Sequence, residues 1–275
     1  MIKELVIAKS PAAAHSLASE QGYCYISGGT EINRLNSDAT ATKVVSLQNM
    51  PFKGIEKISS ECDGVKHDNL KIGSLCTFEE CLKSADVPDD LKRALAFNSS
   101  LQKRNMATIG GNIAAARDDS YLIPTLAALN AKVLVRKKKN PIRIFDFLGN
   151  RGKEDLIEAI IVPLCKRRAA SYRIANTAAS HACVTVSLGC CGKPGDLKMP
   201  IAAAAVKGYG IMEIQAVEEE IESSGKIDPE KLQKAVMNCK IALKDDKVYG
   251  SAAFRKYEIG ASIYLAAEEL AKIFA

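Results

Sequence analysis

The sequence contains no tryptophan, few aromatic residues and few histidines, and each shortage argues against a kind of site. Aromatic residues make up 5% of the chain, and the basic run Arg136–Lys139 has no stacking motif around it. We therefore do not expect the net charge of +6 to reflect nucleic-acid binding. The three histidines, at positions 15, 67 and 181, are too widely spaced to predict a metal site built by this chain alone.

Long apolar runs and a convincing targeting segment are also lacking. No window reaches the roughly 18 consecutive apolar residues of a membrane-spanning helix, so we expect no membrane span. The segment 1–22 superficially resembles a targeting peptide, but Glu4 interrupts its apolar stretch, and a short strand and an alanine-rich helix are predicted there instead. We therefore expect the protein in the cytoplasm.

Cysteines are present, but not in the spacing of a metal site or a redox dithiol. None forms a Cys-x-x-Cys pair, and the adjacent Cys190 and Cys191 are too close for ordinary disulfide geometry. The pattern favours free thiols that act as small buried side chains in a reducing cytosol. The nine cysteines lie at positions 24, 62, 76, 81, 165, 183, 190, 191 and 239.

The chain has 275 residues, 47% of them hydrophobic and 25% charged, which is typical of a globular protein with two domains. Its first 50 residues alternate between strand and helix patterns. Strands are predicted at 3–8, 23–27 and 41–49, with a helix from Pro11 to Gln21 that ends at Gly22. Together with a short helix-like stretch after residue 30, this predicts a β-α-β-α-β unit.

The pattern changes twice after this unit. Strands at 55–58 and 70–72 are predicted to pair across a turn at Asp63-Gly64, followed by helices at 77–84, 88–95 and 121–129 and strands at 132–136, 142–147 and 157–162. Beyond a charged linker near Pro163 and Lys166–Arg168, strands are predicted at 171–174, 182–188 and 201–206, then helices at 211–223, 229–238 and 252–273. Strands and helices that are segregated in this way favour an α+β second domain.

Two glycine pairs follow or adjoin apolar segments. In Ser27–Thr30 (Ser-Gly-Gly-Thr), glycines allow positive φ and a close approach of the backbone to a ligand, and successive amide groups can form a concave anion site. Thr30 can cap the stretch that follows. Thr108–Asn112 (Thr-Ile-Gly-Gly-Asn) repeats the design about 80 residues later.

Together the two segments favour a shared pyrophosphate over two unrelated tight turns, although ordinary turns remain the alternative. Neither has the Gly-x-Gly-x-x-Gly spacing of a Rossmann domain or the spacing of a phosphate-binding P-loop.

With these residues the chain resembles the medium, FAD-binding subunits of molybdenum hydroxylases, such as xanthine dehydrogenase and aerobic CO dehydrogenase. The resemblance covers essentially the whole chain. Four stretches carry it: Ser27–Glu31 (family Ala-Gly-Gly-Thr-Asp/Glu), Ile72–Thr77 (Ile-Gly-Ala-x-x-Thr), Arg104–Asn112 (Arg-Asn-x-Ala-Thr-Ile-Gly-Gly-Asn) and Ser251–Arg255 (Ser-Ala-x-Tyr-Arg).

The resemblance implies a mixed α/β, α+β fold in two domains. A two-lobed FAD-binding domain of the CO-dehydrogenase flavoprotein type is expected at 1–164, with lobes at about 1–52 and 53–164. A smaller α+β domain with an antiparallel sheet and helices is expected at 165–275. Relatives with an additional iron–sulfur cluster carry a cysteine-rich insertion, which this chain lacks.

The resemblance also implies which residues bind FAD. The diphosphate would lie on 26–33 and 108–112, while Thr77, Ile161 and Arg173 would lie near the flavin ring. The full set is Ile26, Ser27, Gly28, Gly29, Thr30, Glu31, Ile32, Asn33, Thr77, Asn105, Thr108, Ile109, Gly110, Gly111, Asn112, Ile161 and Arg173. Ordinary core packing is an alternative role for Ile161, and a surface charge is one for Arg173.

The chain departs from the family beyond Asn112. Tyr121 stands where relatives have an aspartate that meets the ribityl region, and Arg117-Asp118 replaces Ser-Pro. Asp118 and Asp119 are candidates to replace that aspartate at a different spacing.

The function implied is electron transfer within a complex. A partner subunit with a molybdenum cofactor would hydroxylate the substrate, and an iron–sulfur subunit would pass electrons through FAD to NAD+ or another acceptor. Two alternatives remain open. A stand-alone flavin oxidoreductase would need a base, for which His67 and His181 are the histidine candidates, and an FAD-free scaffold subunit would explain the departures around Tyr121.

Overall fold

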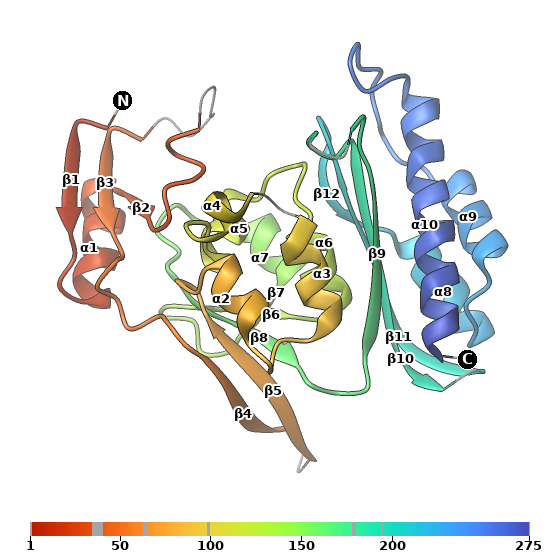
Figure 1. Ribbon diagram of the computed structural model, residues 1–275, viewed down its shortest axis with the longest axis horizontal. Helices are drawn as coiled ribbons and strands as arrows, with labels where there is room; N and C mark the ends of the chain where they lie inside the picture. The colour runs from red at the N-terminus through yellow and green to blue at the C-terminus, as the bar shows by residue number, and fades with distance from the viewer. Residues whose placement is uncertain are drawn as a thin grey trace.

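The computed structural model describes residues 2–34, 41–62, 65–97, 100–177, 180–193 and 195–274, with only the backbone described at 60–62 and 65–67. Three bodies follow one another along the long axis of the molecule: a small N-terminal sheet, a central sheet with its helices, and a C-terminal sheet backed by helices (Figure 1). Each contains its own cluster of buried hydrophobic side chains, around Val45, Leu126 and Ile263 respectively.

The N-terminal body is a three-stranded parallel sheet in the order β1-β3-β2, with one helix. It comprises β1 (Glu4–Ile7), α1 (Pro11–Gln21), β2 (Cys24–Ile26) and β3 (Lys43–Ser46), which confirms the predicted strands and first helix. The helix begins after the capping side chain of Ser10 and ends at Gly22, whose φ is 71°. The predicted second helix is not found at 27–34, which forms bends and a turn, and 35–40 lie outside the described residues.

The central body is a five-stranded antiparallel sheet in the order β4-β5-β8-β6-β7. Its strands are β4 (Ile55–Cys62), β5 (Val65–Gly73), β6 (Lys132–Val135), β7 (Ile142–Arg143) and β8 (Ile157–Pro163). The predicted turn at Asp63-Gly64 lies outside the described residues. The predicted strand 142–147 is wrong after Arg143, because α7 (Ile144–Asn150) follows and buries Ile144 and Phe147 at helical spacing.

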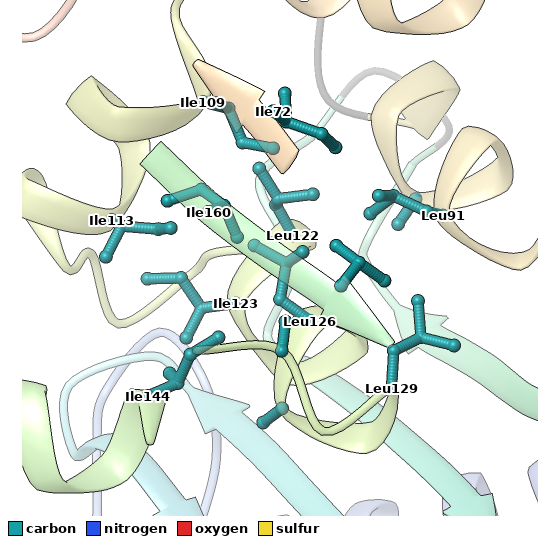
Figure 2. Packing of buried hydrophobic residues seen from close by; sticks show 14 of the residues in the cluster. Ile72, Leu91, Ile109, Ile113, Leu122, Ile123, Leu126, Leu129, Ile144 and Ile160 are labelled. Atoms are coloured by element: carbon teal, nitrogen blue, oxygen red, sulfur yellow. The ribbon is translucent and has the colours of Figure 1, made fainter. Parts of the chain in front are cut away.

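The central helices pack on this sheet and form the largest core with it (Figure 2). They are α2 (Phe78–Lys83), α3 (Asp89–Phe97), α4 (Leu101–Arg104), α5 (Ile109–Ala115) and α6 (Leu122–Ala128). All seven residues of α6 are buried, since this helix also packs against β10 and β11 of the C-terminal sheet. Thr125 of α6 meets that sheet through its hydroxyl, which lies 2.8 Å from Ser171 Oγ and 3.1 Å from Ser187 Oγ.

The C-terminal body is a four-stranded antiparallel sheet in the order β12-β11-β10-β9, with three helices on the face away from α6 (Figure 1). The strands are β9 (Arg168–Ile174), β10 (Val184–Lys193), β11 (Asp196–Val206) and β12 (Gly210–Glu213), and the helices are α8 (Gln215–Ser224), α9 (Pro229–Asn238) and α10 (Ala252–Phe274). The predicted segregation of strands and helices is confirmed, and with it the α+β class.

Two details of this body differ from the sequence-based expectations. The predicted helix 211–223 is wrong over its first four residues, because 211–213 pair with 203–205 as an edge strand and α8 begins at Gln215. Arg167, expected in a charged linker, is only 5% exposed. Its guanidinium donates to the carbonyl oxygens of Ala128 (2.5 Å), Met199 (2.8 Å) and Gly189 (3.1 Å), so the junction between the central and C-terminal bodies is an ordered contact.

Candidate cofactor site

The first glycine segment turns the chain sharply after β2. Gly29 has φ 69°, a left-handed conformation that favours glycine, and the amide of Asn33 donates to the Gly29 carbonyl at 3.1 Å to close a turn. Among the described residues, no group accepts a hydrogen bond from the amides of Gly28, Gly29, Thr30 and Ile32. This leaves four neighbouring backbone donors for a ligand.

The second glycine segment is not a separate tight turn but the first turn of α5. Thr108 is the N-cap, and its hydroxyl accepts from the amide of Gly111 at 3.1 Å. The amides of Ile109 and Gly110 donate to Cys76 and Ser74, and that of Asn112 to Thr108. The second segment therefore uses its amides within the protein, and the free donors come from the first segment.

The two segments contact each other closely. Ser27 Oγ lies 2.9 Å from Thr108 Oγ1. A Cβ on Gly28 would lie 1.8 Å from the carbonyl oxygen of Met106, and one on Gly110 would lie 2.5 Å from Ser74 Cβ. Gly28 is required because the N-terminal and central bodies approach each other at backbone distance, and Gly110 because α5 packs closely on the residue after β5 within the central body.

A cavity of about 540 Å³ lies where these segments meet, a volume typical of small-molecule and cofactor sites. Eleven of the predicted residues line it: Ile26, Ser27, Gly28, Gly29, Thr30, Glu31, Ile32, Thr108, Gly110, Gly111 and Asn112. Tyr25, Leu47, Leu75 and Leu156 also line it, as do Arg117, Asp119, Tyr121 and His181.

The structure places six predicted residues away from the cavity wall. Thr77 caps α2, accepting from the amide of Glu80 at 3.2 Å. Ile161 lies within β8, between Lys71 and Lys132. Asn105 ends α4. Ile109 is fully buried in the central core. Asn33 and Arg173 are the remaining two predicted residues that do not line the cavity.

Arg173 approaches the cavity from behind Tyr121. Its guanidinium donates to the Tyr121 hydroxyl at 3.0 Å and lies 5.1 Å from the centre of that ring and 5.3 Å from the ring of Phe97. The Tyr121 hydroxyl in turn donates to the carbonyl of Ser180 at 3.2 Å. Tyr121, the residue that departs from the family pattern, therefore lines the cavity. The contacts of its hydroxyl with Arg173 and Ser180 hold it in place.

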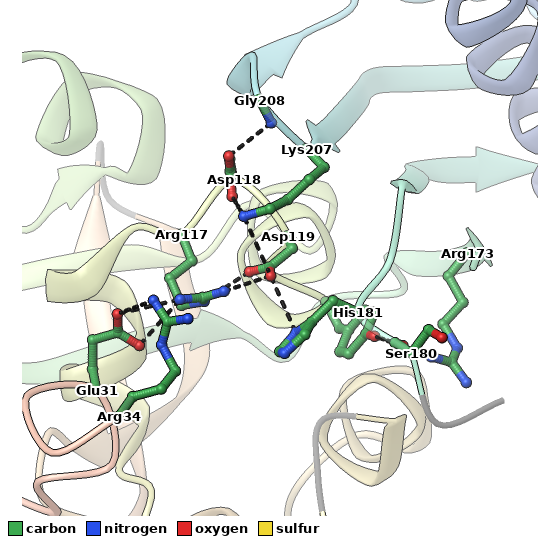
Figure 3. A network of polar contacts seen from close by, with 11 residues as sticks. Glu31, Arg34, Arg117, Asp118, Asp119, Arg173, Ser180, His181, Lys207 and Gly208 are labelled. Carbon is green, nitrogen blue, oxygen red and sulfur yellow. Dashed lines mark hydrogen bonds and ion pairs between the residues drawn. The ribbon is translucent and has the colours of Figure 1, made fainter. Parts of the chain in front are cut away.

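A network of charged side chains runs along the cavity wall (Figure 3). Arg117 donates to both oxygens of Asp119, at 2.7 and 2.5 Å, and to Glu31 at 3.2 Å. Glu31 also accepts from Arg34 at 3.1 Å. The network thus connects the first glycine segment to the loop between α5 and α6.

The network continues into the C-terminal body. Lys207 Nζ lies 2.7 Å from Asp118 and 3.7 Å from Asp119, and His181 Nδ1 lies 3.1 Å from Asp119 Oδ2. Burial raises the pKa of Asp119, but the positive charges around it, Arg117 foremost, outweigh burial and hold that pKa below its usual value. Asp119 is therefore an anion at neutral pH.

Sequence reasoning missed Lys207 as a member of this site and gave His181 no more than a candidate base. Both come from the C-terminal body, and no local pattern around either residue predicts that it reaches Asp119. The side chain of His67, the other candidate base, lies outside the described part of the chain, and His15 contacts Ser19 on α1.

The fold and site match known proteins. Residues 3–165 match the family model of the FAD binding domain in molybdopterin dehydrogenase, more than half of the chain, and the chain therefore belongs to this family. The family model describes an FAD-binding domain of oxidoreductases of this class, so FAD is the cofactor of this chain, as the sequence motifs predicted.

Individual relatives extend the match beyond residue 165. The uncharacterized protein YgfM of Escherichia coli (strain K12) is 27% identical over 238 residues, 86% of this chain and 83% of YgfM. A chain of carbon monoxide dehydrogenase from Hydrogenophaga pseudoflava superimposes with a TM-score of 0.83 at 16% identity, covering 100% of this chain and 99% of that one.

Quinoline 2-oxidoreductase from Pseudomonas putida 86 gives a TM-score of 0.79 at 16% identity, over 99% and 97% of the two chains. These structural matches confirm the predicted fold over the whole chain.

The residues present fit FAD. Four amides that have no partner within the described part of the chain lie in one cavity, as a diphosphate requires, and glycines keep side chains out of the same place. The described residues contain no cluster of three or more potential metal ligands, and none of their helices is long and apolar enough to cross a membrane.

Proposed function

We propose that the FAD diphosphate lies on the amides of Gly28, Gly29, Thr30 and Ile32. The observation that carries this proposal is the set of four unpartnered donors in a cavity between two bodies. Thr108 and Ser27, whose hydroxyls are 2.9 Å apart, hold the two sides of the cavity together. The eleven cavity-lining residues named above are the proposed contacts of FAD, and the other six support them from outside.

In this proposal the three bodies make up two domains, the first of which has two lobes. Residues 1–164 form the FAD-binding domain, with lobes at about 1–52 and 53–164, and residues 165–275 form the second domain. The second domain contributes to the site through Lys207 and His181, which meet Asp119. When bound, FAD accepts and passes on electrons, and the chain binds, orients and shields it.

The chain acts within a complex, in this proposal. One partner subunit carries a molybdenum cofactor and oxidises the organic substrate, and a second carries iron–sulfur clusters that deliver electrons to FAD here. NAD+ is the proposed final acceptor, and the cytoplasm the proposed location. Support comes from the family and from the near-complete match to carbon monoxide dehydrogenase and quinoline 2-oxidoreductase chains.

Purification of the tagged full-length chain from its natural host tests the proposal. We expect a yellow protein with one FAD per chain, together with partner chains that contain molybdenum and iron. A colourless chain that gains no flavin absorbance on addition of FAD would contradict the cofactor proposal. NADH oxidation that bleaches and restores the flavin bands of the complex would support NAD+ as the acceptor.

A stand-alone flavin oxidoreductase remains the second candidate, because the base that it needs is present: His181 lines the cavity and is paired with Asp119. Turnover of a small substrate by the isolated chain, with FAD as its one cofactor, would favour this candidate and overturn the subunit proposal.

A further inference from the structure

His181 is held at the cavity wall by two contacts. Its Nδ1 lies 3.1 Å from Asp119 Oδ2, and the preceding residue, Ser180, accepts a hydrogen bond from Tyr121 through its carbonyl. Figure 3 shows its ring extending toward Asp119. A buried carboxylate thus orients the imidazole, and a tyrosine holds the backbone next to it.

The partner of Nδ1 determines the state of the other ring nitrogen. The side chain of Asp119 is 2% exposed, and Arg117 and Lys207 keep it ionised, so it can accept but not donate. His181 must then carry hydrogen on Nδ1, which leaves Nε2 to take up or release a proton. Nε2 has no hydrogen-bond partner among the described residues, and the side chain is 63% exposed.

Ionisable side chains line several parts of the cavity: Glu31, Arg34, Lys103, Arg117, Asp119, Lys153, Asp155 and His181. Among these, the imidazole of His181 is the side-chain type whose protonation changes nearest neutral pH. A flavin ring gains and loses protons with its electrons, so a group of this type in the FAD cavity suits proton exchange with that ring.

We propose that His181 is the residue that exchanges a proton with the flavin ring, oriented for this by Asp119. When two electrons arrive from a reductant, the Nε2–H bond of the imidazolium breaks and its proton forms a new N–H bond on the ring. The neutral imidazole then regains a proton from solvent. The reductant is the iron–sulfur partner of the proposed function, on which this inference rests, or dithionite in an experiment.

The other charged groups of the network are Arg117 and Asp118, from the α5–α6 loop, Lys207 at the end of β11, and Glu31 and Arg34 from the first glycine segment. Arg117 and Lys207 keep Asp119 ionised, while Glu31 balances Arg117 and Arg34. Proton exchange at this place thus depends on His181, whose Nδ1 is paired with Asp119 while Nε2 has no partner among the described residues.

The test follows the imidazole itself by NMR in the full-length protein labelled with ¹⁵N-histidine and loaded with FAD. His181→Gln assigns the signal, because it removes this one imidazole. His15, on α1 and outside the cavity wall, is the matched control. Titrations are recorded with the flavin oxidised and after reduction by dithionite.

We expect reduction to move the pH midpoint of His181 upward by about 0.5 unit or more, because negative charge is added beside it, while His15 stays in place. The one-bond couplings should show hydrogen on Nδ1 in the neutral ring. An identical His181 midpoint in both redox states would overturn the inference while leaving FAD binding intact. Failure of the wild-type chain to bind FAD would instead overturn the proposed function, and this inference with it.

Discussion

The hydroxyl of Ser27 lies 2.9 Å from that of Thr108, joining two glycine segments that are 81 positions apart in the sequence. Thr108 also caps α5 by accepting from Gly111, so the same oxygen starts a helix and meets the opposite wall. This contact places the two segments opposite each other. They form two sides of one cavity rather than two copies of one anion site.

Gly28→Ala tests the close approach of these walls. A Cβ here would lie 1.8 Å from the backbone oxygen of Met106, so the backbone must shift. We expect a loss of about 1–3 kcal/mol in the free energy of unfolding and at least tenfold weaker FAD binding, measured by denaturant unfolding and flavin fluorescence. Gly149→Ala in α7 is the control, because nothing lies within 4 Å of its Cβ.

The control should be as stable as the wild type or slightly more so, since alanine favours a helix over glycine by about 1 kcal/mol. Wild-type stability and FAD affinity in Gly28→Ala would show that the walls are not in the contact described.

The carboxylates of the network predict how stability depends on pH. Although burial raises their pKa values, the arginines outweigh it, so both Asp119 and Glu31 have a lowered pKa in the folded protein. Their contribution is fully present above the ordinary values, 3.8 for Asp and 4.5 for Glu, and is lost as the pH falls through the lowered ones. Thermal unfolding should therefore show decreasing stability below about pH 5.

Arg117→Gln should reduce this pH dependence and lower stability at pH 7 by about 2 kcal/mol or more, because Asp119 is left buried without its main partner. The control is Arg143→Gln, which removes a more exposed pair with Glu213 and should change stability by less than about 1 kcal/mol. Equal effects of the two substitutions at pH 7 would contradict the role given to Arg117.

A substitution tests the position of Arg173 behind Tyr121. Because its guanidinium contacts the rings of Tyr121 and Phe97 and does not line the cavity, Arg173→Met should leave FAD affinity within about threefold of wild type. It should lower stability by about 1 kcal/mol through the lost cation–π and hydrogen-bond contacts. Fluorescence titration with FAD checks the first expectation; a loss of more than about tenfold would place Arg173 against the cofactor instead.

Much of the fold and of the cavity was predictable because the signals are local. Alternation, caps and the Arg104–Asn112 motif placed the main elements and the two glycine segments. Predictions failed for short segments whose secondary structure depends on tertiary packing. Ile144–Phe147 is helical because its apolar residues face the core. Ile211–Glu213 is an edge strand because it pairs with β11.

The charged residues of the site were harder to predict from the sequence. Asp119 was a candidate from the sequence to replace the family aspartate, but Lys207 and His181 are brought to it by the packing of the C-terminal sheet on α6. Arg167, predicted in a linker, shows the same limit, since its three carbonyl partners belong to separate elements.

The most direct measurement of the central claim is an FAD titration of the double variant Gly29→Val/Gly111→Val. Valine at 29 must adopt φ 69°, and a Cβ at 111 would lie 2.8 Å from Thr108 Oγ1 and 3.1 Å from Ser27 Oγ. Gly22→Val is the control, with a similar φ of 71° and nothing within 4 Å. We predict that the double variant loses FAD binding while its C-terminal body stays folded by NMR, and that the control keeps wild-type affinity. Unchanged FAD affinity in the double variant would contradict the placement of the diphosphate.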